Sequence, residues 1–403
     1  MREPKEACFQ PGGGERWRDP FPMYAALRDH DPVHRVPDNG KGEDYYVLSR
    51  FSDVFAAAVD AKTFSSASGL TFDYGDMEAL GLDSPIVMMD PPEHTSLRKL
   101  SIKQFTPRQV QALEPMIRAF VIERVERMRE MGEADVIEML FKPLPSLVVA
   151  HFLGVPIEDR GLFDRWTQSI VAANAAGDAL DAKEAIAEIV VYFSKLIQDR
   201  RDTPSDDMLS ALVHGQLSDG NEVSMAKILG MGFTMVTGGN DTVTGLLGGA
   251  AELLTLFPEQ RRRLIEDSSL LPNAIEEMLR LTSPVQGLAR TLTRDVEIHD
   301  VEIPAGRKAL LLYGSANRDA REFGDDADKL DVGRRIRRHL SFSYGPHFCI
   351  GAAAARLQTT VALEELLARC PGFGVDTEQA RFAGGAHTRR HESLPFYADG
   401  LDG

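Results

Sequence analysis

An isolated cysteine lies in a loop of glycine, proline and aromatic residues, and this segment is well suited to chemistry. Residues 342–351 read Phe-Ser-Tyr-Gly-Pro-His-Phe-Cys-Ile-Gly, and an alanine-rich stretch follows at residues 352–367. Glycine and proline predict a tight loop, and the alanine-rich stretch predicts a helix that begins directly after the loop. Backbone N–H groups and the positive end of the helix dipole favour a thiolate at Cys349.

Two other roles of Cys349 agree with the sequence to different degrees. A buried, inert cysteine is the commoner fate of an isolated Cys, and the loop alone does not exclude it. A zinc site is excluded more firmly, because His347 and Cys349 are only two residues apart and the chain has no Cys-x-x-Cys. With Cys8 and Cys370 the chain has three cysteines, which form no even disulfide framework. This number fits a reducing compartment.

A second unusual segment, residues 224–257, combines the apolar spacing of a helix with many glycines. They are Gly230, Gly232, Gly238, Gly239, Gly245, Gly248 and Gly249. Each interior glycine costs about 1 kcal/mol relative to alanine, so burial must stabilise such a helix. Close packing of other chain segments and a flat ligand lying across the helix are both consistent with this pattern.

The composition excludes several classes of function. A net charge of −16 argues against nucleic-acid binding, which needs clustered basic side chains. Apolar stretches such as residues 144–155 are too short and too interrupted to span a bilayer. Residues 1–15 are polar and glycine-rich, without the apolar core of a signal peptide. These patterns predict a cytoplasmic protein without a membrane anchor.

Apolar residues at spacings of three and four predict helices at residues 107–131, 181–201, 224–257 and 351–370. Strand patterns are fewer, at residues 45–49, 289–298 and 308–313. The sequence shows no internal repeat or linker. The predicted fold is therefore mainly α with a small segregated β portion. We expect one domain over residues 1–403, with a flexible N-terminal segment at residues 1–19.

The cysteine loop resembles the haem-binding loop of the cytochromes P450. The matching residues are Phe342, Gly345, His347, Cys349 and Gly351, and Ser343 stands where the family commonly has glycine. The resemblance implies that Cys349 is the axial ligand of haem b, whose thiolate favours cleavage of the O–O bond. It also implies the single-domain cytochrome P450 fold, a triangular helical prism with haem between the glycine-rich helix and the helix after the loop.

The family's buried Glu-x-x-Arg network has its counterpart in Glu277, Arg280 and Arg334. The spacing of Glu277 and Arg280 alone would indicate only a surface pair worth a few tenths of a kcal/mol. Arg334 lies eight residues before Phe342, which is the distance at which the family places the third member. The resemblance therefore predicts a buried network beside the cysteine loop.

Four donors match the family's residues that bind the haem propionates. They are His94, Arg98, Arg290 and His347. His94 and Arg98 are four residues apart and share one face of a predicted helix. Charged hydrogen bonds contribute about 1.5 to 3 kcal/mol each, so four donors could position the macrocycle firmly.

Residues 238–242, Gly-Gly-Asn-Asp-Thr, resemble the family's oxygen-binding motif. The resemblance implies that Asp241 and Thr242 form the acid–alcohol pair, and a hydroxyl beside a carboxylate can relay protons. Gly238 replaces the more usual alanine, which should leave extra room above the iron. The family's recognition regions also imply the substrate-pocket residues Leu70, Thr71, Phe72, Tyr74, Val87, Met88, Met89, Thr234, Gly238, Val285, Leu288, His387 and Thr388. Core packing explains each of these single side chains equally well.

The resemblance covers residues 20–396, and residues 237–249 and 282–295 are most similar to mycobacterial family 130. It implies a monooxygenase that inserts one oxygen atom of O2 into a hydrophobic small organic molecule by hydroxylation or dealkylation. The sequence has no dinucleotide-binding fingerprint and no length for a fused reductase. NAD(P)H is therefore expected to act only through a separate ferredoxin and ferredoxin reductase.

A basic cluster is the candidate docking site for the ferredoxin, although a solvated loop explains it equally well. It comprises Arg334, Arg335, Arg337 and Arg338. Since the resemblance places Arg334 in the internal network, the outward candidates are Arg335, Arg337 and Arg338. Two other functions stay open as alternatives. A haem-thiolate sensor or electron carrier would not need Asp241 and Thr242. A peroxide-driven hydroxylase would typically have arginine and proline at those two positions.

Overall fold

The computed structural model describes residues 8–38, 43–72, 84–163, 165–166, 169 and 183–400. Helices dominate the described chain. The α-helices are α1 (Phe21–His30), α2 (Phe51–Val59), α4 (Glu93–Ser101), α5 (Pro107–Gln111), α6 (Glu114–Met131), α7 (Pro143–Phe152), α9 (Lys183–Asp202), α10 (Met208–Val213), α11 (Met225–Leu256), α12 (Pro258–Glu266), α13 (Leu271–Thr282), α14 (Tyr313–Ala316), α15 (Ala320–Phe323) and α16 (Ala352–Arg369). A π-helix, η4 (Ile137–Phe141), precedes α7, and the short 3-10 helices include η1 (Gly14–Trp17), η2 (Ile86–Met88) and η7 (Gly345–His347).

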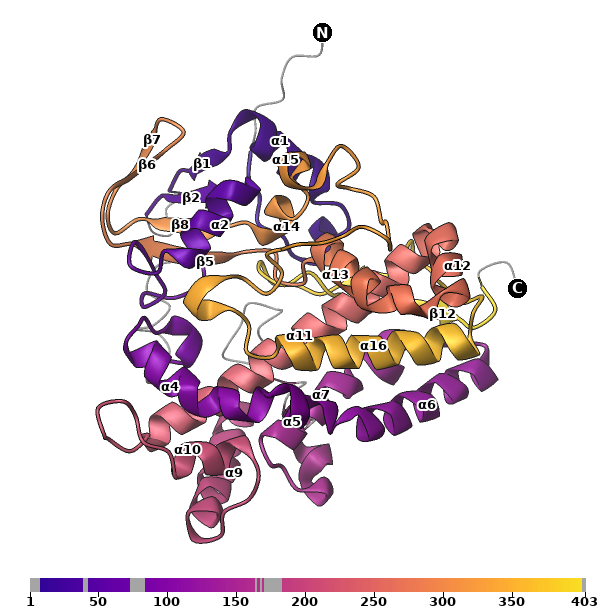
Figure 1. The fold of residues 1–403 in the computed structure, drawn as a ribbon, viewed down its shortest axis with the longest axis horizontal. Coiled ribbons are helices and arrows are strands. Elements are labelled where there is room, and N and C mark those ends of the chain that lie inside the picture. Colours follow the sequence, from indigo (N-terminus) through magenta and orange to yellow (C-terminus); the bar gives the residue numbers. More distant parts are fainter. Residues whose placement is uncertain are drawn as a thin grey trace.

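The strands are short, and those labelled β1, β2, β5, β6, β7 and β8 gather at the upper left of Figure 1, whereas β12 lies at the right. They are β1 (Val33–Val36), β2 (Tyr45–Leu48), β3 (Phe64–Ser65), β4 (Glu133–Asp135), β5 (Leu288–Leu292), β6 (Val296–Ile298), β7 (Val301–Ile303), β8 (Lys308–Leu311), β9 (Gly374–Val375), β10 (Arg381–Phe382), β11 (His391–Ser393) and β12 (Pro395–Tyr397). The largest sheet has the order β1-β2-β8-β5-β3, in which only β2 and β8 are parallel. The predicted fold class, mainly α with a segregated β portion, is confirmed.

Helix α11 crosses the middle of the molecule (Figure 1) and packs against α7, α13 and α16. It begins after Ser224, whose side chain accepts a hydrogen bond from the N–H of Lys227. It ends just before Pro258, which starts α12. Sixteen of its residues are buried, and they are a main part of the largest apolar cluster of the protein.

The helix predicted over residues 107–131 is two helices, α5 and α6. The break lies before Pro115, which occupies the first turn of α6. Proline has no N–H to donate to the carbonyl four residues earlier, that of Gln111, and it is tolerated in the first turn of a helix, so one helix ends at Gln111 and the next begins at Glu114. Helix α6 packs along α16, and Arg118 of α6 joins the two through ion pairs with Glu364 and Glu365 of α16.

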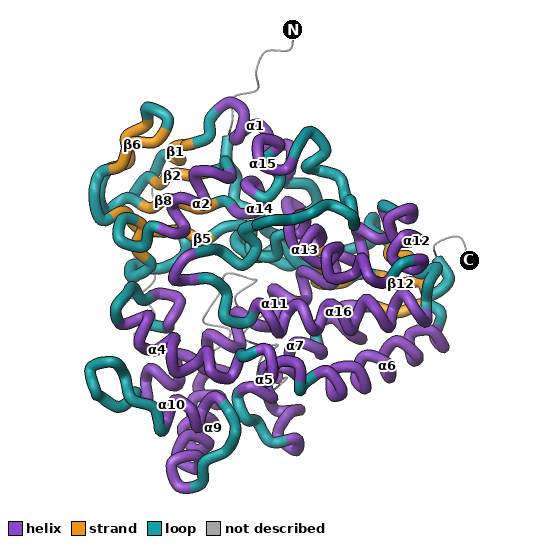
Figure 2. Tube along the Cα trace, viewed as in Figure 1, coloured by secondary structure: helices purple, strands orange, loops and turns teal. Residues whose placement is uncertain are grey.

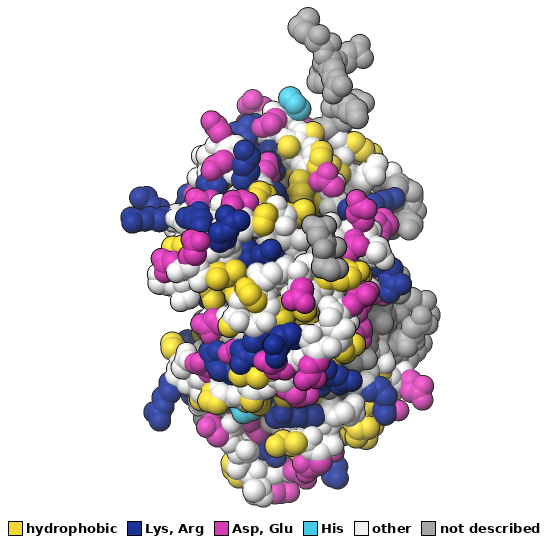
Figure 3. Space-filling model, turned by 90° about the vertical axis from the view of Figure 1, so that its right-hand side faces the viewer, with side chains coloured by type: hydrophobic (Ala, Val, Ile, Leu, Met, Phe, Trp, Pro, Cys, Tyr) yellow, Lys and Arg dark blue, Asp and Glu magenta, His cyan; other side chains and the backbone are white. Residues whose placement is uncertain are grey.

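Ion pairs of this kind are common on the surface. Figure 3 shows acidic and basic side chains interspersed over the face that lies at the right of Figure 1. The net negative charge of the chain is therefore not gathered into one large acidic patch on this face.

A long connection between α15 and α16 carries the cysteine loop, and its only helical turn in the described chain is η7 (teal tube in Figure 2). It passes beside α13 and delivers residues 342–351 to the start of α16. The site thus depends on contacts that fix this connection, since no regular element does so.

The N-terminal residues lie on the C-terminal loops. Of the segment that was predicted to be flexible, residues 1–7 lie outside the described residues. Residues 8–19 include Trp17, which is only 1% exposed and donates through Nε1 to the carbonyl of Gly385 at 3.0 Å. Arg18 donates to the carbonyls of Thr377 and Ala380. This part of the segment is packed against the rest of the protein.

Candidate active site

Backbone hydrogen bonds fold the cysteine loop back on itself. The N–H of Cys349 donates to the carbonyl of Phe342 at 2.9 Å. Gly345 has a φ of 68°, and a Cβ there would lie 2.8 Å from the carbonyl oxygen of Ala58, so no larger residue fits. Ser343 has a φ of 56°, in the left-handed region that strains a side chain. This backbone conformation explains the family's preference for glycine at that position.

The sulphur of Cys349 lies at the start of α16. It is enclosed by protein on most sides, yet the side chain remains accessible to a ligand. Burial raises the pKa of the thiol, whereas the N–H groups of Gly351 and Ala352 and the guanidinium groups of Arg98 and Arg356 act in the opposite direction. A thiol of this kind becomes a thiolate when it coordinates a metal ion.

The four predicted propionate donors lie close together. The rings of His94 and His347 have centroids 4.2 Å apart, and Nε2 of His347 lies 3.1 Å from Oγ of Ser66. Arg98 donates to the carbonyl of Phe348, and the buried Arg290 donates to that of its neighbour Ala289. The four residues belong to α4, β5 and the cysteine loop, which are far apart in the sequence.

This donor cluster fits an anionic ligand. Nδ1 of His94 is buried without a hydrogen-bond partner, and within the described part of the chain no carboxylate is hydrogen-bonded to any of the four side chains. Burial, followed by Arg98, lowers the pKa of His94 to about 4. Burial, followed by Arg290 and the other two donors, lowers the pKa of His347 to about 3. Haem carries two carboxylates, and donors of this kind bind carboxylates.

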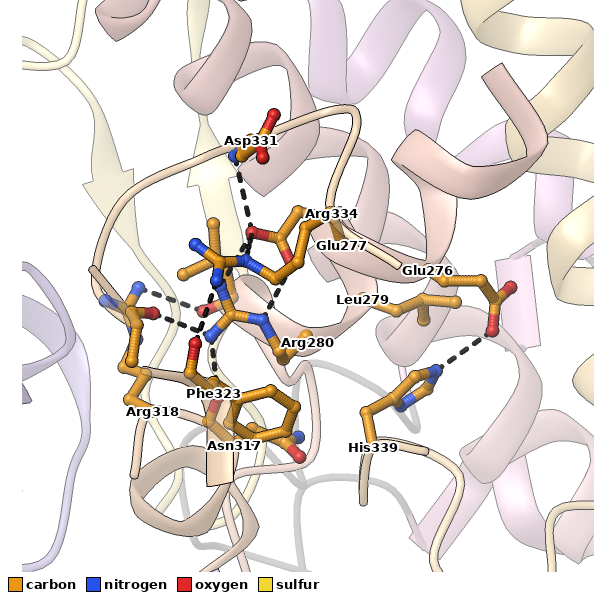
Figure 4. A network of polar contacts seen from close by, with 12 residues as sticks. Glu276, Glu277, Leu279, Arg280, Asn317, Arg318, Phe323, Asp331, Arg334 and His339 are labelled. Atoms are coloured by element: carbon orange, nitrogen blue, oxygen red, sulfur yellow. Dashed lines mark hydrogen bonds and ion pairs between the residues drawn. The ribbon is translucent and has the colours of Figure 1, made fainter. Parts of the chain in front are cut away.

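The structure brings Glu277, Arg280 and Arg334 together in one buried network (Figure 4). Glu277 and Arg280 are both fully buried, and two hydrogen bonds of 2.7 Å join them. Arg334 donates to Glu277 at 3.0 Å, and Arg280 also donates to the carbonyls of Asn317 and Ala327. The network fastens α13 to the connection that carries the cysteine loop.

The adjacent residue Glu276 belongs to a second cluster, which we did not predict. It accepts hydrogen bonds from Arg356 on α16 at 2.6 and 2.8 Å and lies 3.1 Å from Nε2 of His339. Burial would raise the pKa of Glu276, but Arg356 and His339 outweigh it and hold the pKa at about 2. Arg356 also lies over the ring of Phe342 at 4.7 Å. No spacing in the sequence connects these residues.

Asp241 and Thr242 follow each other on α11 and have different surroundings. The hydroxyl of Thr242 donates to the carbonyl of Gly238 at 2.8 Å. The carboxylate of Asp241 pairs with Nε of Arg390 at 2.6 Å. Burial raises the pKa of Asp241 to about 6, although Arg390 and Lys142 act to lower it. Both basic partners were missed in the sequence, because neither lies near the motif along the chain.

The glycines of α11 have two different roles. A Cβ at Gly238 would meet no described atom within 4 Å, which agrees with open space beside Thr242. A Cβ at Gly232 likewise meets no described atom within 4 Å, whereas a Cβ at four other positions would lie within 2.9 Å of another segment. These contacts are Gly239 with Val149, Gly245 with Arg389, Gly248 with His391 and Gly249 with Thr282. Close packing of chain segments therefore explains these four glycines, and a ligand lying across the helix remains an explanation for Gly238.

Several predicted pocket residues lie in pairs. The rings of Phe72 and His387 have centroids 5.3 Å apart, and Val285 forms an isolated β-bridge with Thr388. Helix η2, which contains Val87 and Met88, lies against α11, and Thr234 donates to the carbonyl of Gly230 on α11.

Other predicted pocket residues have mainly packing contacts or lie elsewhere. Met89 is buried in the main core, and Leu288 packs beside Val285 in the cluster of the large sheet. The carbonyl of Leu70 accepts from the N–H of Ala289, and that of Thr71 accepts from Lys308. Tyr74 lies outside the described residues.

The basic cluster is less open than the sequence indicated. Arg338 forms two hydrogen bonds with Glu322 and lies over the rings of Phe51 and Phe55. Arg334 belongs to the buried network, and Arg335, Arg337 and Arg338 are exposed. Because Arg338 is paired with Glu322, Arg335 and Arg337 remain as the docking candidates.

A family model described as "Cytochrome P450" matches residues 30–372. The chain belongs to the cytochrome P450 family. It is 57% identical over 393 residues to cytochrome P450 130 of Mycobacterium tuberculosis (strain ATCC 25618 / H37Rv), covering 96% of this chain and 97% of that protein. It is 35% identical to the cytochrome P450 monooxygenase PikC of Streptomyces venezuelae, covering 89% and 85%. Among solved structures, the cytochrome P450 PksS of Bacillus subtilis 168 superposes with a TM-score of 0.88 at 30% identity, covering 97% of this chain and 100% of that one.

These comparisons confirm the predicted family, its fold and the similarity to mycobacterial family 130. The protein is a cytochrome P450 monooxygenase, and the family implies a haem cofactor and the use of O2. None of the described helices has the length and apolar character needed to cross a membrane.

Proposed function

We propose that this P450 inserts one oxygen atom of O2 into a hydrophobic small organic molecule, by hydroxylation or dealkylation. The observation that carries the proposal is the exposed residue Cys349 beside four donors that have no hydrogen-bonded carboxylate among the described residues. The relatives support the reaction type. Two of them, 35% and 34% identical, are named mycinamicin IV hydroxylase/epoxidase of Micromonospora griseorubida and vitamin D(3) 25-hydroxylase of Pseudonocardia autotrophica.

Haem b is the cofactor that these residues would hold. Cys349 would bind the iron, Phe342, Gly345 and Gly351 would shape the loop around the sulphur, and the donors His94, Arg98, Arg290 and His347 would bind the propionates. When bound, haem with a thiolate ligand supplies the chemistry with dioxygen, and the thiolate favours cleavage of the O–O bond.

The acid–alcohol pair is proposed to deliver protons. Thr242 Oγ1 donates to the carbonyl of Gly238, beside which no described atom would contact an added Cβ, and it can hold a proton donor there. Asp241, with a pKa of about 6, can exchange protons near neutral pH, as an acid–base group must. A sensor or an electron carrier would need neither residue.

The substrate is proposed to contact the segments that hold Phe72, Val285, Leu288, His387 and Thr388. Apolar side chains dominate this set, and apolar pockets with a few polar groups bind hydrophobic small molecules. A screen of candidate molecules by the shift in the haem absorption spectrum would identify those that enter the pocket.

Electrons are proposed to come from NAD(P)H through a ferredoxin reductase and a ferredoxin, with the P450 as a single domain over residues 1–403 in the cytoplasm. The exposed Arg335 and Arg337 are the candidate contacts for an acidic ferredoxin. Opposite charges raise the association rate of such partners, and salt weakens this attraction.

The axial ligand is the first point to test. Cys349→His should still bind haem but lose oxygenase activity, because a neutral imidazole lacks the electron donation of a thiolate. The reduced carbon monoxide complex of the wild type should show the strongly red-shifted thiolate band, and the variant should lack it. Cys370→Ala is the matched control and should keep the band, because Cys370 is buried in the core away from the loop. A wild type without the band, or a Cys349→His variant with it, would contradict the assignment.

A further inference from the structure

Asp241 is held by an arginine that belongs to a loop of the proposed pocket. Nε of Arg390 lies 2.6 Å from Oδ1 of Asp241, and their side chains are only 8% and 18% exposed. Removing one partner of a buried ion pair leaves an uncompensated charge, so the two residues depend strongly on each other.

The loop reaches Asp241 by lying directly on α11. Gly245 is four residues after Asp241 and therefore shares its face of the helix. A Cβ at Gly245 would lie 2.6 Å from the carbonyl oxygen of Arg389 and 3.3 Å from Cβ of Arg390. One turn further, a Cβ at Gly248 would lie 2.8 Å from Nδ1 of His391. Two glycines thus permit three consecutive loop residues to contact the helix.

This pocket loop, residues 384–391, comprises the loop before β11 and the first residue of that strand, His391, and it carries two of the predicted pocket residues. Thr388 pairs with Val285, and the carbonyl of His387 accepts from the N–H of Gln286 at 2.7 Å. The N–H of Arg389 donates to the carbonyl of Pro284 at 2.8 Å. Thr388 and Arg390 are only two residues apart, so a displacement of one is transmitted through a short, hydrogen-bonded backbone.

We propose that Arg390 is a positioning residue for Asp241, and that it ties the carboxylate to the pocket loop, residues 384–391. The proposal rests on the proton-relay role of Asp241 given above. A molecule that moves His387 or Thr388 also moves the guanidinium group of Arg390. Occupancy of the pocket thereby changes the charge environment of the residue that delivers protons.

Other charged groups lie nearby and define the controls. Lys142, just after the π-helix η4, also lowers the pKa of Asp241 and is itself paired with Glu138. Further along α11, Glu252 is paired with Arg389 at 3.3 Å and lies 3.7 Å from His391. Arg389 is therefore a buried arginine of the same loop that has a different carboxylate as its partner.

The test follows the carboxyl group itself rather than turnover. Infrared spectra of the haem-loaded protein would be recorded over pH 4.5 to 8.5, and the protonated-carboxyl band that disappears in Asp241→Asn belongs to Asp241. We expect a midpoint near pH 6 for the wild type. In Arg390→Gln the midpoint should rise by about 1 to 3 units, because an opposite charge is lost. Arg390→Lys keeps the positive charge, so its midpoint should lie close to that of the wild type. Arg389→Gln should leave the midpoint unchanged.

Hydrogen exchange tests the link to the loop. The amides of residues 384–391 should exchange faster in both Asp241→Asn and Arg390→Gln than in the wild type, and Thr242→Ala should exchange as the wild type does. An unchanged midpoint in Arg390→Gln, or an unchanged loop in Asp241→Asn, would overturn the proposal. Should Arg390→Gln fail to fold, the exchange of the loop amides in Asp241→Asn, which breaks the same ion pair from the other side, still tests the proposal. Neither readout depends on catalysis, so failure of the relay itself is seen separately, as an unchanged rate of turnover in Asp241→Asn.

Discussion

A single methyl group at Gly245 would test the close approach of the pocket loop to α11. In the structure, a Cβ there lies 2.6 Å from the carbonyl oxygen of Arg389, and 3.3 Å from Cβ atoms of Arg390 and Pro284. The carbonyl must retreat by roughly 0.8 Å to reach ordinary van der Waals contact. Its movement is opposed, because the N–H of Arg389 is bonded to the carbonyl of Pro284.

The magnitude follows from two opposing effects. Alanine in place of an interior glycine favours the helix by about 1 kcal/mol. Overpacking against a backbone group costs about 1 to 3 kcal/mol. Gly245→Ala should therefore lower the free energy of unfolding by up to about 2 kcal/mol. Gly238→Ala changes the same helix, but no described atom lies within 4 Å of the new methyl group. This change should raise the free energy of unfolding by up to about 1 kcal/mol.

Urea unfolding followed by far-ultraviolet circular dichroism would compare the two variants with the wild type. The informative result is whether each variant has a lower or a higher free energy of unfolding than the wild type. If Gly245→Ala is stabilised as much as Gly238→Ala, the loop does not lie on the helix as described. The Gly238 methyl should also weaken the binding of bulky ligands and hardly affect small ones, so tighter binding of large ligands would show that Gly238 does not face the pocket.

Three further changes test other parts of the site. Thr242→Ala should bind haem and consume oxygen, but release more hydrogen peroxide and less product, and unchanged coupling would remove the hydroxyl from the relay. Glu276, whose pKa is lowered from 4.5 to about 2, contributes stability that is complete above about pH 4.5 and is lost as the pH falls toward 2. In Glu276→Gln the free energy of unfolding should therefore fall less between pH 4.5 and 2 than in the wild type. An equal fall in both proteins would exclude the Glu276 cluster as its source. Charge reversal of Arg335 and Arg337 should slow reduction by the ferredoxin but not by dithionite, and equal rates with the ferredoxin would refute the docking site.

The sequence was sufficient for the elements and motifs that are local in the chain. The cysteine loop and the helix predicted over residues 224–257 depend on neighbouring residues, and the structure agrees with them, since α11 spans Met225–Leu256. The helix predicted over residues 107–131 failed at one point, because the apolar spacing continues through a proline that ends one helix and starts the next.

Partners from distant segments could not be predicted in the same way. Arg390 follows a loop that has no periodic pattern, and its contact with Asp241 depends on glycines whose role is visible only when the loop is in place. Lys142 follows a π-helix, which no apolar spacing indicated. The pairing of Glu276 with Arg356 and His339 likewise depends on how α13 and α16 pack.

The packing of the N-terminal residues on the C-terminal loops has a consequence for how the protein is made. Trp17 donates to Gly385, and Arg389 donates back to the carbonyl of Trp17, across more than 360 positions of the chain. A ribosome that adds about 5 to 20 residues per second needs roughly 20 to 70 s between these segments. During that interval the indole of Trp17 has no native partner, and the loop that holds Asp241 does not yet exist. The proton-delivery side of the pocket is therefore among the last parts of the molecule to form during synthesis.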